Sequence, residues 1–324
     1  MLDRRSWIVP VVVAMFAMAI GLVLGSGPLR TALIGSLGTQ VESLEDQVDA
    51  AERSAEEANI ANDYGAAYID ATAPGLLNGA LDGHVVATVA VDAADTDDLG
   101  AIELRFQEAG AKLGASVAIE PTWSDPNQSA FRAALAPQLA ISVAGLDGTE
   151  SVDEVFAHAL AQALMPDRFP EGVDSETGVT GPDGEVGADR AEVLWTLLAD
   201  AELVSGTRTE GADAVALVAG EAVTPEDATQ LQATSSTTLA QVFAEYDVAI
   251  VAANGPEQDG DLASAIIKDP DDLGARISTV TWINTPYSQV SVALALQEQF
   301  AGWVGHYGPG EGRDAAPPPP AQTS

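Results

Sequence analysis

The chain has 324 residues, no cysteine and a formal net charge of −36, from 13 basic and 49 acidic side chains. Without cysteine it forms no disulfide and offers no thiolate ligand to a metal. So acidic a composition also argues against binding to nucleic acid or to anionic lipid headgroups, because both require clustered basic side chains.

An apolar segment near the N-terminus, residues 7–24, follows the basic pair Arg4 and Arg5. At the rise of an α-helix this segment spans roughly 27 Å, close to the thickness of the hydrocarbon core of a bilayer. We therefore predict that residues 1–28 form a cytoplasmic start and a single transmembrane anchor in the cell membrane, with the body on the extracytoplasmic side. A cleaved signal peptide is the alternative, and Pro28 favours a retained anchor.

The next segment, residues 29–63, carries a heptad pattern and predicts a coiled-coil stalk. Apolar residues recur at alternating spacings of three and four, namely Ile34, Leu37, Val41, Leu44 and Val48, followed by Ala51, Ala55 and Ala58. We predict that the first five mediate self-association or capture of a partner's helix. A lone helix lying on the globular domain is the alternative.

Residues 64–314 alternate between β-rich runs and amphipathic stretches, which predicts a doubly wound, Rossmann-like α/β domain. We expect strands at residues 84–91, 115–119, 214–218, 248–252 and 277–283, and helices at 99–112, 131–139, 152–165, 190–204, 238–246 and 287–304. The stretch 166–188 is a predicted loop and a possible boundary between two subdomains. Residues 315–324, rich in proline, are a predicted disordered tail.

Enzyme motifs are absent from the sequence. It has no glycine-rich dinucleotide turn, no phosphate-binding loop with lysine, no Gly-x-Ser-x-Gly elbow and no His-Glu-x-x-His pair. We therefore predict a protein that is not an enzyme, with no catalytic and no cofactor-binding residues.

Candidate metal ligands are few. His158 and Met165 are seven residues apart on one predicted helix and could present nitrogen and sulfur to copper, although two core side chains would have the same spacing. The acidic residues of the loop 92–98 either hold a hard cation weakly or cap the following helix. His306 is placed at the start of the tail. The acidic surface is typical of solvated side chains, with a cation attractor as the alternative.

Several segments together resemble one protein family. They are the end of the anchor (21–27), the strand at 84–91, Ala109-Gly110, the segment 276–280 and the glycine-rich pattern at 305–312. In these and in its order of elements, the chain resembles the mycobacterial copper transport protein B family of actinobacterial envelope proteins.

The resemblance implies copper efflux and homeostasis in the cell envelope, with copper as the cargo and a proposed role as an outer-membrane pore. It also implies a second possibility, since some relatives are linked to cell separation through a partner protein. No ligand residue carries over. Two functions therefore remain: copper homeostasis, or an envelope scaffold that binds a partner through its stalk, for example in cell division or separation. The alternation of strands and helices favours an anchored α/β domain over a pore.

Overall fold

The computed structural model describes residues 8–25, 28–92, 94–168, 188–220, 226–256, 258, 260–310 and 313–314. Within these ranges, side chains are described except at residues 8–9, 23–25, 28–42, 188–189 and 226–234. The chain divides into two compact units, residues 1–65 and 66–324. We call the second unit the head.

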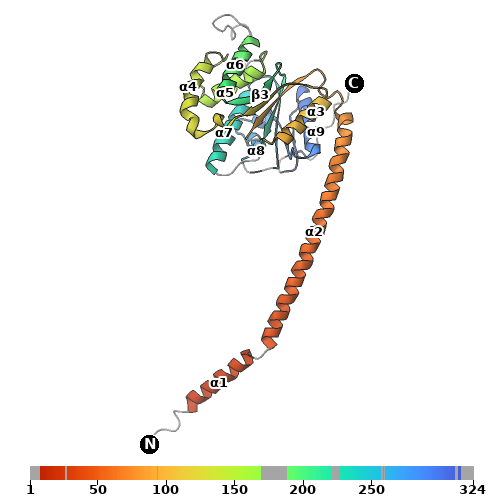
Figure 1. The fold of residues 1–324 in the computed structure, drawn as a ribbon, viewed down its shortest axis with the longest axis vertical. Coiled ribbons are helices and arrows are strands. Elements are labelled where there is room, and N and C mark those ends of the chain that lie inside the picture. Colours follow the sequence, from red (N-terminus) through yellow and green to blue (C-terminus); the bar gives the residue numbers. More distant parts are fainter. Residues whose placement is uncertain are drawn as a thin grey trace. The chain divides into compact units, whose positions relative to one another are not determined.

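The first unit contains α1 (Ile8–Gly25) and most of α2 (Pro28–Leu77), as Figure 1 shows. Pro28 is the first residue of α2, a position at which the missing N–H of proline leaves no hydrogen bond unmade. Among the described residues, no helix is both long enough and apolar enough to cross a membrane.

Helix α2 continues beyond the predicted end of the stalk at residue 63 and reaches Leu77. Its last turns carry Ile69, Ala73 and Leu77 at spacings of four, so these residues share one face of the helix. Ala73 and Leu77 are fully buried and Ile69 packs against the same apolar cluster of the head. This stripe explains why the helix persists into the head, where the sequence pattern predicted that the alternation of strands and helices had already begun.

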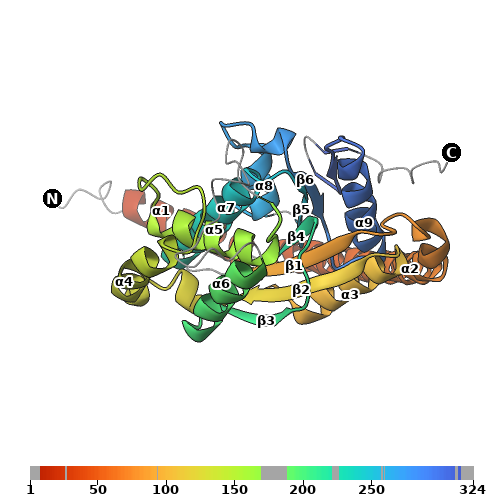
Figure 2. The ribbon, with the colours of Figure 1, turned by 90° about the horizontal axis from the view of Figure 1, so that it is seen from above.

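The head is built on one seven-stranded sheet with the order β3-β2-β1-β4-β5-β6-β7, and Figure 2 labels strands β1 to β6. Its strands are β1 (Val85–Val91), β2 (Lys112–Ile119), β3 (Val204–Arg208), β4 (Ala214–Ala219), β5 (Ala249–Asn254), β6 (Ser278–Thr281) and β7 (His306–Tyr307). All neighbours are parallel except β2 and β3, which are antiparallel. The sheet therefore combines strands from both sides of the segment 169–187, which lies outside the described residues.

Both faces of the sheet are covered by helices, which is why its central strands are apolar throughout. In β4, Val215 and Leu217 belong to one apolar cluster, whereas Ala216 and Val218 belong to the other. Figure 2 shows the helices of the first face, α4 (Ser129–Ala140), α5 (Val152–Leu164), α6 (Ala188–Asp200), α7 (Glu226–Phe243) and α8 (Leu262–Ile267). The second face is covered by α3 (Thr96–Glu108), α9 (Pro286–Phe300) and the last turns of α2. The predicted α/β class with a mostly parallel sheet is confirmed.

Several predicted helices end earlier than the sequence suggested, and the difference is four residues for those predicted at 99–112, 190–204 and 287–304. The helix predicted at 190–204 is α6, which stops at Asp200; Glu202 then takes a left-handed conformation with φ 53°, and Val204 begins β3. The helix predicted at 99–112 is α3, which ends at Glu108. Gly110, with φ 89°, turns the chain into β2. For the helices predicted at 99–112 and 190–204, the last predicted helical residue is instead the first residue of a strand.

The prediction that His306 lies at the start of the C-terminal tail is wrong. His306 and Tyr307 form β7, the edge strand that pairs with Thr279 and Val280 of β6. Two residues are too few to show strand periodicity, so the pairing depends on the neighbouring strand. The predicted tail, residues 315–324, lies outside the described residues.

Candidate functional site

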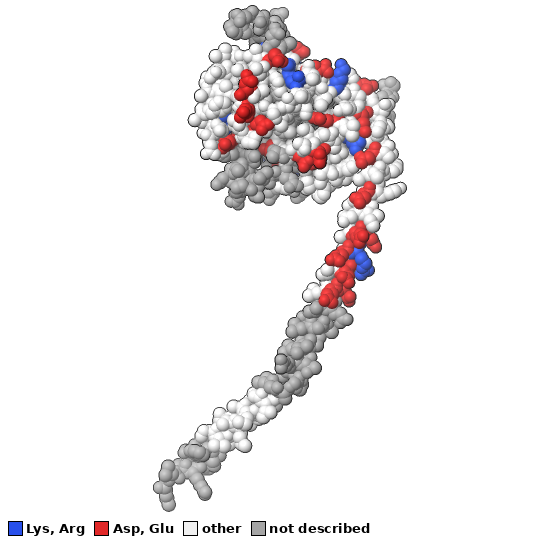
Figure 3. Space-filling view, in the orientation of Figure 1, with Lys and Arg blue, Asp and Glu red and all other residues white. Residues whose placement is uncertain are grey.

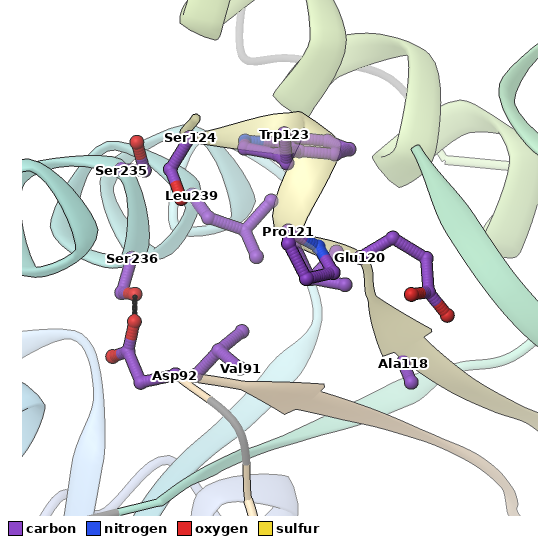
Figure 4. Close-up of a pocket in the computed structure, with 11 residues that line it drawn as sticks. Val91, Asp92, Ala118, Glu120, Pro121, Trp123, Ser124, Ser235, Ser236 and Leu239 are labelled. Atoms are coloured by element: carbon purple, nitrogen blue, oxygen red, sulfur yellow. Dashed lines mark hydrogen bonds between the residues drawn. The ribbon is translucent and has the colours of Figure 1, made fainter. Parts of the chain in front are cut away.

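A pocket of about 240 Å³ lies at the carboxyl ends of β1 and β2, beside α7. Its lining, drawn in Figure 4, comprises Val91, Asp92, Ala118, Ile119, Glu120, Pro121, Trp123, Ser124, Ser235, Ser236 and Leu239. Strand β1 has β2 on one side and β4 on the other, so the strand order reverses its direction beside β1. Open α/β sheets bind ligands outside the carboxyl ends of their strands at such a reversal. We call this hollow the carboxyl-edge pocket.

Asp92 is a residue of this pocket whose surroundings change its pKa. It follows β1 directly and has a left-handed backbone with φ 52°. Figure 4 shows its carboxylate facing Ser236, whose hydroxyl donates a hydrogen bond of 2.6 Å to Oδ1. Burial raises the pKa of Asp92, and the hydrogen bond from Ser236 opposes part of that rise.

The carboxyl-edge pocket has both polar and apolar lining. The apolar part includes Val91, Leu239 and the almost completely buried Trp123. The lining contains no histidine, cysteine, lysine or arginine among the residues that the structure describes. A serine beside a carboxylate without an imidazole is not the nucleophile and base pair of a hydrolase. The described lining therefore offers carboxylate and hydroxyl oxygens beside apolar side chains.

A second polar cluster lies at the opposite, amino-terminal edge of the sheet. His84 precedes β1, and its Nδ1 is 3.0 Å from Oδ2 of Asp213, the residue before β4. Asp213 also accepts the backbone N–H of Val85 at 2.9 Å, and the imidazole stacks on Phe300 with ring centroids 3.6 Å apart. A carboxylate on Nδ1 fixes the orientation of an imidazole and directs Nε2 outward, the arrangement that commonly supports a metal-binding histidine.

The predicted metal candidates His158 and Met165 lie in the interior of the head. His158 is in α5, where Nδ1 is 3.0 Å from the Tyr246 hydroxyl and Nε2 is 3.7 Å from Glu245. Burial lowers the pKa of His158, against the opposing effect of nearby carboxylates. Met165 is the C-cap residue that follows the same helix, and it is fully buried. In the part of the chain that the structure describes, no polar contact of His158 involves Met165.

The third histidine, His306, also makes a polar contact within the head. Nδ1 of His306 is 3.0 Å from the hydroxyl of Thr279, and burial lowers the pKa of the imidazole. In the acidic loop, Asp95 caps α3 by accepting the N–H of Asp97 at 2.7 Å, as one of the two interpretations of that loop predicted. Among the described residues, no group of three or more histidine, aspartate or glutamate side chains is placed to hold a metal ion.

A sequence model of the family described as "Copper transport outer membrane protein, MctB" matches residues 1–318. The chain belongs to this family. Proteins named copper transporter MctB from Mycobacterium bovis and from two strains of Mycobacterium tuberculosis are 25% identical to it over 324 residues. Each alignment covers 96% of this chain and 98% of the relative. The family resemblance expected from the sequence is confirmed.

Two of the segments that suggested the MctB family are neighbours in the sheet. The segment 276–280 leads into β6, and the glycine-rich pattern at 305–312 contains β7, with Thr279 paired to His306. The strand at 84–91 is β1, next to β4 in the middle of the sheet. These segments therefore build the sheet, and of their residues only Val91, the last residue of β1, lines the carboxyl-edge pocket.

The predicted stalk of this MctB-family chain is helical throughout, within α2. Leu44 and Val48 are 59% and 54% exposed. The side chains of Ile34, Leu37 and Val41 lie outside those described. Figure 3 shows acidic side chains along this helix and spread over the visible face of the head, with few basic ones.

Sequence reasoning missed both polar clusters of the head. Asp92 and Ser236 are 144 positions apart, and His84 and Asp213 are 129 apart. The sequence contains one usable signal, since Asp92 directly follows a buried strand, where ligand-binding side chains of α/β sheets often lie.

Proposed function

We propose that this chain takes part in copper transport and homeostasis in the cell envelope. The observation that carries the proposal is the match of residues 1–318 to the MctB family model, supported by relatives named copper transporters that align along nearly their whole length. The role that we propose is non-enzymatic, because the family description names transport.

For its placement, we propose a single membrane pass at residues 7–24, with the N-terminus in the cytoplasm. The basic pair Arg4 and Arg5 supports this orientation. The stalk and the head, a doubly wound Rossmann-like domain, would then lie outside the cytoplasm. A reporter fused after Ser324 should be active only outside the cytoplasm, and the protein should require detergent for its extraction. Release of the intact chain by a high-salt wash would contradict the anchor.

We propose that the head holds copper weakly and at several positions. Oxygen ligands are abundant, whereas a site of high affinity for Cu(I) needs several sulfur or nitrogen ligands. Of the three histidines, His84 is the best candidate, since Asp213 orients its ring while its side chain is 33% exposed. His158 and Met165 would then serve as core residues.

The test is a gene deletion in the host with copper added to the medium. We expect the deletion to raise cell copper and copper sensitivity, and the full-length gene to restore both. Unchanged cell copper in the deletion strain would contradict a role in copper homeostasis.

An envelope scaffold is the second candidate, and the exposed apolar side chains of Leu44 and Val48 favour it. If this is the main role, Leu44→Asp with Val48→Asp should abolish function in the cell while the copper content stays normal. Rescue of growth and cell separation by the doubly substituted gene would exclude the scaffold.

A further inference from the structure

The two core positions of the heptad in the stalk hold different types of apolar residue. Position a holds the β-branched residues Ile34, Val41 and Val48, and position d holds Leu37 and Leu44. In parallel coiled coils, this combination favours two strands over three or four. All five residues belong to one uninterrupted helix, α2.

We call the row of side chains at positions a and d the seam. In the described part of the stalk, the seam is exposed to solvent. Leu44 is 59% exposed and Val48 is 54% exposed, and residues 43–65 are all exposed. A helix derives most of its stability in a protein from packing of an apolar face. A second helix laid along this face would bury these side chains.

The residues that flank the seam determine the direction of pairing. Position e holds Glu45 and Glu52, and position g holds Gln40 and Gln47. In a parallel pair, position g of one helix meets position e of the other, so glutamine amides meet carboxylates and no like charges face each other. In an antiparallel pair, the rows of glutamate at position e would face each other and repel.

The C-terminal end of the seam contains a residue that specifies the register of the two helices. Asn62 occupies position a, 14 residues after Val48, and it is exposed in α2. A single asparagine at position a favours two strands in register, because only then do the two amides meet. The next position a is Ile69, which packs into the head. The seam therefore extends from Ile34 to Asn62.

We infer that the partner of the stalk is a second copy of this chain, paired in parallel and in register over residues 34–62. This inference deepens the stalk role proposed above and rests on it, but it does not depend on copper handling. Two chains anchored in one bilayer satisfy the parallel direction without further rearrangement.

The chain has no cysteine, so a single introduced cysteine can form a disulfide between chains only with the same cysteine of a second copy. This allows a direct test. In the full-length protein in detergent, Leu44→Cys and Val48→Cys should each form a disulfide-linked species of twice the chain mass when oxidised glutathione is added. The matched control is Asp46→Cys, on the outer face of the same turn, which should remain largely unlinked.

The mass of the protein without introduced cysteines provides an independent measurement. Light scattering in detergent should give a protein mass of two chains, which falls twofold in Leu44→Asp with Val48→Asp. The control pair Ser43→Asp and Ala50→Asp adds the same charge on the outer face and should leave the mass at two chains.

A mass of one chain or of three chains would overturn the inference. Equal linking at residues 46 and 48, or linking at only one of residues 44 and 48, would also overturn it, since an antiparallel or unspecific pair would then explain the data. Cell copper content plays no part in these measurements, so failure here is distinguishable from failure of the copper role.

Discussion

The stalk and the head reach their structures by different routes. In the head, strands such as β1 and β4 are buried on both faces by helices distant in sequence. In the stalk, the side chains that the structure describes, those of residues 43–63, are all exposed. The comparison teaches that long-range packing specifies the head, whereas the stalk is a local structure, one helix whose described side chains are exposed.

The largest expected effect on stability is the difference between replacing a buried leucine of the head and replacing an exposed leucine of the stalk. Leu160 of α5 is fully buried, so Leu160→Ala should reduce the free energy of unfolding of the head by about 2–5 kcal/mol. The matched change in the stalk, Leu44→Ala, should alter head stability by no more than about 0.5 kcal/mol. Urea unfolding followed by tryptophan fluorescence measures both. Equal losses would mean that the stalk packs on the head and that the comparison is wrong.

A smaller loss is expected at the ion pairs that hold the last turns of α2 to the head. The guanidinium of Arg105 is buried and pairs with Asp70 of α2 and, at 2.9 Å, with Glu108. Because Arg105→Met leaves these carboxylates without their cation, it should cost about 1–3 kcal/mol of head stability. Arg53→Met in the stalk removes an exposed arginine and is the control. Similar unfolding midpoints for both variants would contradict a structural role for the buried pair.

Sequence reasoning recovered the parts of the fold that have a local signal. The apolar run that forms β1 and the helix that forms α5 were predicted within a residue or so of their bounds. β3 was missed because its five residues contain one apolar side chain, Val204, which also fits the end of the preceding helical pattern. The pairs Asp92 with Ser236 and His84 with Asp213 depend on strand order, which no local pattern specifies.

The pH dependence of head stability should also differ from that of the stalk. Burial lowers the pKa of His158 below its value in the unfolded chain, so the unfolded state binds the proton more readily. Stability should therefore fall as the pH drops below about 6.5, the pKa of an unfolded histidine. His158→Gln should make this fall shallower.

His306→Gln serves as the companion variant, because burial lowers the pKa of His306 in the same direction. Thermal unfolding between neutral and mildly acidic pH measures both slopes. A slope that neither substitution changes would contradict the assignment to buried imidazoles.

The smallest expected effect is at the carboxyl-edge pocket. Burial raises the pKa of Asp92, so its charged form is unfavourable in the folded head at neutral pH. Asp92→Asn keeps an acceptor for Ser236 and tolerates the left-handed backbone, so stability should rise by up to about 0.5 kcal/mol at neutral pH. A clear loss of stability would instead indicate that the carboxylate is required by the fold.

The copper account is tested most directly by titrating the full-length protein with Cu(II) while recording its electron paramagnetic resonance spectrum. We predict weak binding at several positions, reduced by salt, with nitrogen coupling in one fraction of the bound copper. That coupling should disappear in His84→Ala and persist in His158→Ala and Met165→Leu. A single tight, stoichiometric site that is lost in His158→Ala or Met165→Leu would contradict the account and place copper in the interior of the head.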